Sequence, residues 1–208
     1  MLATEKKLPE KITRKRKVPE ALIYEVIDGE PLYYKGYKDV LCGKKTLEDI
    51  MGSSSLQFVL VHYLLGVMHR HLDEDAYYFA TNEAGLHIDH KNNLANDIAL
   101  YAVNVLTPDK ISDKYADVAP ELAIEIDTKA DLSSRPDYDY VNLKTQKLLD
   151  FGVKQVIWIF TRTQKVMIAP QGKDWLIVDW KKDIELTDGL SFNIAGYLAK
   201  KGIEITRK

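Results

Sequence analysis

One short apolar stretch carries a carboxylate where a buried strand is expected. Residues 121–127 read Glu-Leu-Ala-Ile-Glu-Ile-Asp and follow directly after Pro120. Branched apolar residues dominate this stretch, as is typical of a short buried strand. Burying the Glu125 side chain alone is costly unless the carboxylate is paired, protonated or bound to a metal. The sequence therefore predicts that Glu125 has a partner elsewhere in the chain.

The composition is that of a globular protein with a hydrophobic core. Hydrophobic residues make up 46% of the 208 residues, and charged residues make up 29%. The formal net charge of -2 argues against a broadly basic nucleic-acid binder, although a local groove or metal ions could still bind DNA. The one cysteine, Cys42, allows no intrachain disulfide, and no segment has the apolar length of a membrane span or signal peptide. We expect a cytoplasmic protein with no membrane contact.

The N-terminus differs in charge from the rest of the chain. Residues 1–18 contain seven Lys or Arg and two Glu, which gives this segment a net charge of +5. We expect a basic, disordered arm over residues 1–20 and a single domain over residues 21–208. A solvated tail and a phosphate-contacting arm are both compatible with this charge.

Apolar runs and turn residues predict an α/β fold with a mixed β-sheet flanked by helices. Asp28-Gly29 lies between alternating runs in residues 21–37 and predicts an N-terminal β-hairpin. The expected helices cover residues 56–72, 136–151 and 191–202. The expected strands cover residues 76–80, 85–89, 97–103, 121–127, 154–161, 165–170 and 175–180. Strand 121–127, helix 136–151 and strand 154–161 would form a parallel βαβ unit.

The helix over 136–151 carries a lysine on its apolar face. Ser133 or Ser134 is expected to cap this helix, with Pro136 in its first turn and Gly152 just after its end. Helical spacing places Lys144 on one face with the apolar residues Tyr140, Leu148 and Phe151. Either the lysine stem packs while the ammonium reaches water, or the ammonium points at an anionic group nearby.

Two carboxylates and this lysine form the candidate site. Asp97 stands at the start of the predicted strand 97–103, and Glu125 lies on the strand that leads into the helix of Lys144. Carboxylates on neighbouring strands offer the hard oxygen ligands that Mg²⁺ or Mn²⁺ prefers. Such an ion polarises a phosphoryl oxygen and activates water, and a lysine can stabilise the charge that builds on phosphorus. The trio therefore predicts phosphodiester hydrolysis.

The histidines of the long helix are weaker candidates for a metal site. His62, His69 and His71 lie in the predicted helix 56–72, but no His-x3-His pair occurs on it and no cysteine lies nearby. We interpret them as side chains at the edge of a helix face.

The sequence resembles the PD-(D/E)XK nuclease superfamily, and within it a bacterial family of restriction-endonuclease-like proteins long described as a domain of unknown function. The resemblance runs from about residue 21 to 180, and it is carried by YEVIDGE (24–30), GLHIDHKNNLANDIAL (85–100), APELAIEI (119–126) and KTQKLLDFGVKQVIWIF (144–160). It implies a restriction-endonuclease-like fold, a DNA substrate and a Mg²⁺ cofactor, with Mn²⁺ as an alternative. It also implies that Asp97 and Glu125 bind the metal and that Lys144 is a catalytic lysine moved onto the helix.

Several positions depart from the pattern of this family or extend it. Asn96 stands where the family has proline, Gln57 stands where the long helix often begins with histidine, and Leu148 replaces a tyrosine. Asp127 occupies the usual lysine position two residues after the strand glutamate, where it is either an extra metal ligand or, as we favour, a turn residue. Gln57, Asp127 and the hairpin residue Glu30 are accessory candidates, and Glu30 could equally be a solvated turn residue.

These observations lead to a preferred function and to alternatives. We expect a Mg²⁺-dependent DNA endonuclease in which Asp97 and Glu125 bind the metal and Lys144 assists the attack of water. A catalytically silent nucleic-acid-binding or assembly module on a nuclease fold is the main alternative, since a fold does not fix a function. A metal phosphatase for small phosphoesters would need a closed pocket. Cleavage of both strands usually calls for two active sites, so a homodimer is also expected.

Overall fold

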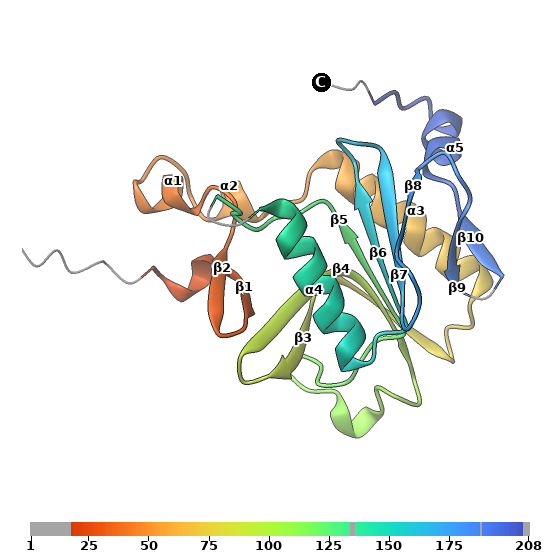
Figure 1. The fold of residues 1–208 in the computed structure, drawn as a ribbon, viewed down its shortest axis with the longest axis horizontal. Helices are drawn as coiled ribbons and strands as arrows, with labels where there is room; N and C mark the ends of the chain where they lie inside the picture. The colour runs from red at the N-terminus through yellow and green to blue at the C-terminus, as the bar shows by residue number, and fades with distance from the viewer. Residues whose placement is uncertain (1–17, 134–135, 188, 206–208) are drawn as a thin grey trace, which may run out of the picture.

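The structure, a computed structural model, describes residues 18–133, 136–187 and 189–205. Its centre is an eight-stranded sheet in the order β2-β1-β4-β5-β6-β7-β8, with β3 paired to β4 (Figure 1). These strands are β1 (Ile23–Ile27), β2 (Glu30–Tyr33), β3 (Tyr77–Asp89), β4 (Asn92–Ala102), β5 (Leu122–Ile126), β6 (Gln155–Phe160), β7 (Lys165–Pro170) and β8 (Leu176–Asp179). The β5–β6 pair is parallel and the other described pairs are antiparallel, which confirms the predicted mixed sheet.

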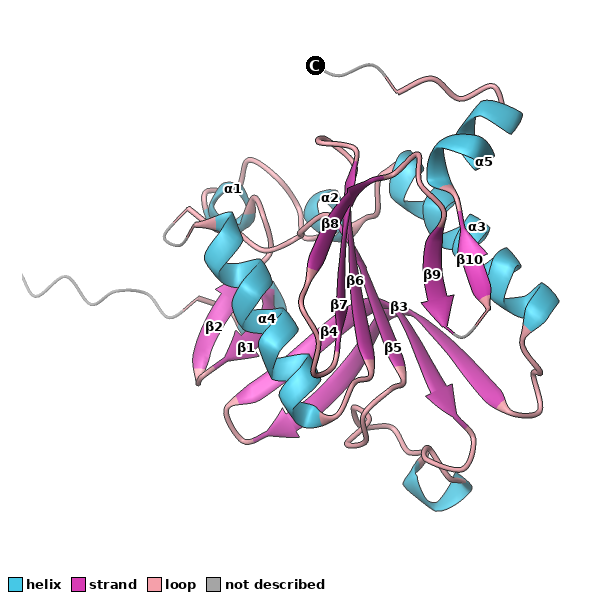
Figure 2. Ribbon diagram, turned by 45° about the vertical axis from the view of Figure 1, so that its right-hand side comes forward, coloured by secondary structure: helices cyan, strands magenta, loops and turns pink. Residues whose placement is uncertain are grey.

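Helices cover both faces of this sheet (Figures 1 and 2). They are α1 (Tyr37–Leu41), α2 (Glu48–Met51), α3 (Ser55–His71), α4 (Asp137–Phe151) and α5 (Ile194–Lys200), with short 3-10 turns at Glu20–Leu22 and Pro108–Lys110. A separate two-stranded sheet, β9 (Ile184–Thr187) with β10 (Leu190–Phe192), was not predicted and contributes to the core beneath α3 and α5.

Strand alternation divides the core into two clusters. Ile157 and Ile159 of β6 pack in the cluster that contains α3, α5 and the two-stranded sheet. Val156 and Trp158 of the same strand pack in the cluster that contains α4 and the β1–β2 hairpin. Because side chains alternate across a strand, Glu125 shares the α4 side of β5 with Ala123. The lysine-bearing helix therefore covers the face on which Glu125 lies.

The β3–β4 hairpin corrects the predicted strand boundaries. The expected strands 76–80 and 85–89 are two halves of one long strand, β3, because the turn-like Asn82 does not end it. Asn82 and Glu83 instead form a bulge, with left-handed φ angles of 63° and 58°. A bulge adds a residue to one strand and redirects side chains without ending the pairing.

The same hairpin changes the position of Asp97. Strand β4 begins at Asn92 and not at residue 97, so Asp97 lies in the middle of a strand and not at its mouth. Pairing with β5 covers Ile98 to Leu100, and Asp97 lies just beyond the paired stretch. This placement leaves a backbone N–H of β5 available to donate a hydrogen bond to a side chain.

The lysine-bearing helix ends as predicted but begins differently. Pro136 is the N-cap residue of α4, and among the described residues no side chain caps the helix, so Ser133 does not provide the predicted cap. Ser134 lies outside the described residues. At the other end, Gly152 adopts a left-handed φ of 116°, and its N–H donates to the carbonyl of Leu149. Such a C-cap ends the helix and turns the chain into β6.

The other expected helices form, but α5 begins at Ile194 and not at residue 191, because residues 191–192 belong to β10. The hydroxyl of Ser54 caps α3 by accepting a hydrogen bond from the N–H of Gln57, at 3.1 Å. None of the helices in the described ranges is long and apolar enough to cross a membrane. Most of the predicted basic arm, residues 1–17, lies outside the described residues, and residue 20 begins a 3-10 turn.

The left-handed C-cap of α4 gives a direct test of this fold. Substituting Gly152→Ala should lower the free energy of unfolding by about 1–2 kcal/mol, because an L side chain is strained at positive φ. The added Cβ would lie 3.4 Å from the Cβ of Ala119, so space is not the limiting factor. Urea denaturation of both proteins measures the change. The control Gly52→Ala, at a φ of -68° with no neighbour within 4 Å, should be close to neutral, and an equal loss in both variants would contradict the assignment.

Candidate active site

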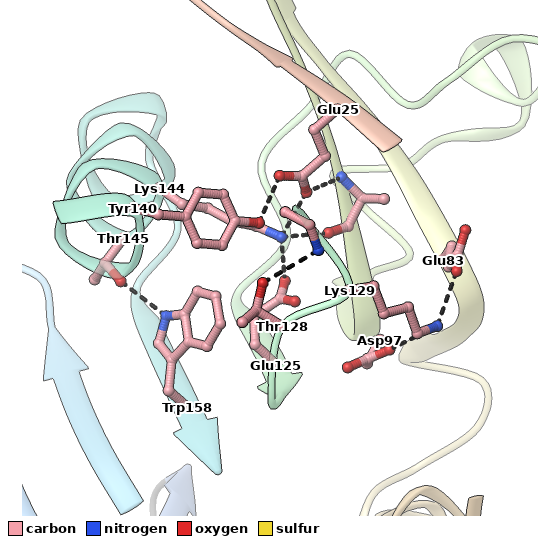
Figure 3. A network of polar contacts seen from close by, with 12 residues as sticks. Glu25, Glu83, Asp97, Glu125, Thr128, Lys129, Tyr140, Lys144, Thr145 and Trp158 are labelled. Atoms are coloured by element: carbon pink, nitrogen blue, oxygen red, sulfur yellow. Dashed lines mark hydrogen bonds and ion pairs between the residues drawn. The ribbon is translucent and has the colours of Figure 1, made fainter. Parts of the chain in front are cut away.

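A fully buried ammonium lies at the centre of the site. Lys144 of α4 is 0% exposed, and its Nζ donates to Glu25 Oε1 and to the carbonyl oxygen of Ala95, both at 2.6 Å. Its Nζ also lies 2.9 Å from Glu125 Oε1, in an ion-pair contact whose angles fall outside hydrogen-bond geometry. Lys144 therefore does not reach water, and the predicted partner of Glu125 is this lysine (Figure 3).

The second carboxylate on this lysine comes from the N-terminal hairpin. Glu25 of β1 accepts from the N–H of Ala95 at 2.9 Å and from the hydroxyl of Tyr140 at 2.7 Å, in addition to Lys144. Glu25 thereby ties the hairpin to β4 and α4 at one point. Every oxygen of this carboxylate has a donor, as a buried charge requires.

Aromatic rings enclose the ammonium. Lys144 Nζ lies 5.6 Å from the ring centre of Trp158 and 5.8 Å from that of Tyr24. The indole N–H of Trp158 donates to the hydroxyl of Thr145 at 2.9 Å, which fixes the ring beneath α4. A cation near aromatic rings is attracted to their faces, and the rings also exclude water.

Burial and neighbouring charges shift the pKa values of this pair. Burial raises the pKa of Glu125 well above its ordinary value; Lys144 opposes this rise, while the charges of Asp97 and Glu25 add to it. Burial alone would lower the pKa of Lys144, but the charges of Glu125 and Glu25 together raise it above its ordinary value. Lys144 is therefore charged at all physiological pH values, and burial favours the protonated form of Glu125.

Asp97 is held by two neighbours at the point where β4 and β5 stop pairing. Its Oδ2 accepts from the backbone N–H of Ile126 at 2.8 Å, and its Oδ1 accepts from Gln57 Nε2 at 2.8 Å. Burial raises the pKa of Asp97, partly offset by the Ile126 N–H and the charge of Lys129. The structure thus brings Gln57, an accessory candidate from the sequence, into contact with Asp97.

A second lysine lies beside Asp97. The Nζ of Lys129 is 3.6 Å from Asp97 Oδ1 and donates to Glu83 Oε1 at 2.8 Å. The other oxygen of Glu83 accepts from the hydroxyl of Tyr34 at 2.7 Å. Figure 3 shows Lys129, Glu83 and Asp97 on the far side of Glu125 from α4.

A cleft gives solvent access to one side of the cluster. Its volume is about 320 Å³, and Asp97, Lys129, Glu83 and the exposed ring of Phe58 are among the residues that line it. Lys144 does not line this cleft. A groove of about 700 Å³ between α3 and α5 contains none of the cluster carboxylates. Glu25 lines a separate hollow of about 650 Å³ beside the hairpin. A substrate that contacts Asp97 and Lys129 would enter the cleft that these two residues line.

Two accessory candidates lie outside the cluster. Glu30 is an exposed residue at the start of β2, which agrees with the alternative that it is a solvated turn residue. Asp127 adopts a left-handed φ of 56°, and its carboxylate accepts from the N–H of Thr161 at 2.8 Å and from the hydroxyl of the same residue. It joins the ends of β5 and β6, which agrees with the favoured interpretation as a turn residue.

Sequence reasoning missed three residues of the cluster. Glu25 showed the same signal as Glu125, because it is a carboxylate inside a short apolar strand. Glu83 was missed because the sequence of a bulge within one strand resembles that of a turn between two strands. Lys129 gave no local signal, since its position depends on how the loop after β5 folds back to Asp97.

The donor chemistry of the cluster fits a divalent cation. The carboxylates of Glu25, Glu83, Asp97 and Glu125 face the two ammonium groups of Lys129 and Lys144, which leaves a formal charge of -2 if all are ionised. In the described ranges no group of three or more Asp, Glu, His or Cys side chains is placed to hold a metal ion. Mg²⁺ is commonly held by one or two carboxylates together with water and substrate phosphate oxygens. Asp97 and Glu125 are the two carboxylates that could supply such ligands.

The structure resembles that of a known protein, although the sequence does not identify a relative. No protein-family model matches the sequence, and a search of curated proteins finds no match. The fold is similar to the crystal structure of a candidate nuclease of the DUF820 family from Anabaena variabilis, with a TM-score of 0.59 and 13% sequence identity. The match covers 84% of this chain and 89% of the other. The fold is therefore nuclease-like, and the predicted α/β class is confirmed.

The raised pKa of Glu125 predicts a pH-dependent gain in stability when its charge is removed. Because its folded pKa lies above the ordinary 4.5, the ionised carboxylate weakens the folded state increasingly as pH rises between the unfolded and folded values. Glu125→Gln also removes one partner of Lys144, so the prediction concerns the pH dependence: its free energy of unfolding relative to the parent should rise by a margin of up to about 1.4 kcal/mol per pH unit above pH 5. Urea unfolding between pH 5 and pH 8 measures this margin.

The matched control for this series is Glu30→Gln, which removes an exposed carboxylate. The free energy of unfolding of Glu30→Gln should differ from that of the parent by the same small amount at every pH. A Glu125→Gln margin that stays constant with pH would contradict the assignment of a raised pKa to this buried group.

Proposed function

We propose that this protein is a metal-dependent endonuclease that hydrolyses phosphodiester bonds in DNA. One observation carries the proposal: the buried carboxylates Asp97 and Glu125 each contact a lysine, and Asp97 with its lysine, Lys129, lines a cleft in a nuclease-like fold. Buried charged clusters with shifted pKa values are concentrated at functional sites. The unbalanced negative charge of this cluster supports a catalytic rather than a purely structural role.

Asp97 and Glu125 would hold Mg²⁺, or Mn²⁺ in its place. When bound, such an ion polarises the phosphoryl oxygen and lowers the pKa of an attacking water. Gln57 and the N–H of Ile126 hold the Asp97 carboxylate in place. Lys144 assists by favouring the ionised, metal-binding form of Glu125 and fixing its position.

The reaction would need few protein groups beyond these. Water forms a new bond to phosphorus while one ester P–O bond breaks, the proton of the water passes to solvent, and the departing oxygen takes a proton from solvent. The cluster contributes positioning and charge stabilisation, which are the main demands of phosphoryl transfer. The exposed Phe58 ring at the cleft could stack on a base, since every base offers a π face.

The expected homodimer remains a prediction, because the structure contains one chain. Two sites would be needed to cut both strands of a duplex at once. A single copy of the site is sufficient to nick one strand.

Plasmid nicking tests the proposal. The purified protein should convert supercoiled plasmid to the open circle in Mg²⁺ or Mn²⁺ and not in EDTA. Asp97→Asn and Glu125→Gln should each lower the rate by at least about 10²-fold, since each removes a charge on which catalysis depends. The control Glu30→Gln should cut at the parental rate.

Three outcomes distinguish this function from its alternatives. Metal-dependent nicking that is lost in both cluster variants supports the endonuclease. Tight DNA binding without nicking in any metal supports a silent binding module. Nicking that survives in both variants means that the activity comes from another site or from a contaminant.

A further inference from the structure

The two lysines of the cluster differ in what their ammonium groups can still contact. Lys144 Nζ has three oxygen atoms within 2.9 Å, from Glu25, Glu125 and Ala95, and its side chain is 0% exposed. A lysine ammonium has three N–H donors. Because three oxygens surround Nζ and no solvent reaches it, Lys144 has no donor that can reach a phosphate or an attacking water.

Lys129 has such a donor. Its Nζ makes one hydrogen bond, to Glu83 at 2.8 Å, and a longer 3.6 Å ion-pair contact with Asp97. Its side chain is 15% exposed, and it lines the cleft beside Asp97. An ammonium in this position can turn an N–H toward an anion in the cleft without breaking its hydrogen bond to Glu83.

The loop after β5 holds Lys129 in a defined place. The left-handed turn at Asp127 redirects the chain, and the carbonyl oxygen of Lys129 then accepts from the N–H of Lys35 at 2.7 Å. The next residue, Ala130, forms a bridge with Tyr34. The backbone of Lys129 is thus anchored to the segment that follows the hairpin, while its side chain points back at Asp97 (Figure 3).

The hydrogen-bond acceptor for Lys129 lies on a strained bulge. Asn82 and Glu83 are consecutive non-glycine residues with positive φ, a conformation that is strained for an L side chain. The bulge directs Glu83 to Lys129 on one carboxylate oxygen and to the hydroxyl of Tyr34 on the other. Strain of this kind concentrates at functional sites, and here it fixes the direction of one ammonium group.

We propose that Lys129 is the lysine that contacts the scissile phosphate, and that Glu83 and Tyr34 are its positioning residues. This inference rests on the proposed nuclease function and deepens it. Lys144 then keeps the carboxylates charged and in place from inside the protein, while Lys129 faces the substrate. Lys129 would donate to a non-bridging oxygen as charge builds on the phosphoryl group, which is where a fixed cation contributes most.

Steady-state nicking kinetics with Lys129→Met test this assignment. In Mg²⁺ the variant should lose about 10²–10³-fold in kcat, the range seen when one oxyanion donor is removed. The melting temperature of the variant is measured in parallel, because Lys129 pairs with Glu83 and Asp97, and the loss in kcat is compared at a temperature at which both proteins are folded. Glu83→Gln should lower kcat less, and Lys129→Arg should restore part of the rate. Lys154→Ala, which removes an exposed lysine paired with Glu121, is the matched control and should cut at the parental rate.

A binding measurement supplies a readout that needs no cleavage. Affinity for a short fluorescein-labelled oligonucleotide is measured by anisotropy in Ca²⁺ over a range of salt concentrations. Loss of one phosphate contact should reduce the log–log salt slope by about 0.7–0.9 in Lys129→Met. The slope should be unchanged in Lys144→Met, provided that this variant still folds.

The outcomes separate this inference from the function on which it rests. If Asp97→Asn is inactive while Lys129→Met cuts like the parent, the function stands and the assignment of Lys129 is wrong. If the parent cuts DNA in none of the metals, the proposed function fails, and the salt slope of DNA binding then tests the contact between Lys129 and phosphate. A reduced slope in Lys129→Met supports this contact, and an unchanged slope contradicts it.

Discussion

The architecture of this site depends on the burial of one lysine ammonium among carboxylates. Lys144 joins Glu25 of the hairpin, Glu125 of the central sheet and the backbone of β4 at distances of 2.6–2.9 Å. A charge without access to water must be paired on all sides, because removing one partner leaves an uncompensated buried charge. This requirement fixes the hairpin, the sheet and α4 relative to one another. The ion-pair cluster therefore specifies the arrangement of these elements as well as the chemistry of the site.

The cluster is not optimised for stability alone. Two ammonium groups do not balance four carboxylates, and burial raises the pKa values of both Glu125 and Asp97 in the folded protein. A purely structural network would be expected to balance its charges, since apolar packing is often at least as stable as a buried ion pair. Instead, the excess negative charge lies beside a cleft with a partly exposed lysine, Lys129. We interpret the imbalance as the stability penalty of a site that binds a cation.

The sequence predicted the elements whose signals are local, and missed those set by tertiary contacts. The Asp28-Gly29 hairpin, the Gly152 helix end and the βαβ unit follow from turn chemistry and periodicity, and all three form. Glu125 and Lys144 were found because each is a charge in an apolar pattern. Lys129 does not lie in an apolar pattern. A left-handed turn and a backbone hydrogen bond to the hairpin segment place it beside Asp97. Glu83 lies on a bulge that sequence patterns cannot distinguish from a turn.

The most direct test of the central claim is the position of a bound metal ion. Crystals soaked in Mn²⁺ and measured for anomalous scattering should show a peak in contact with the carboxylates of Asp97 and Glu125. Crystals of Asp97→Asn treated in the same way should lack that peak. A parental structure with Mn²⁺ bound only elsewhere, or with no peak between these carboxylates at saturating Mn²⁺, would contradict the account, because the unbalanced charge of the cluster would then have no cation to hold.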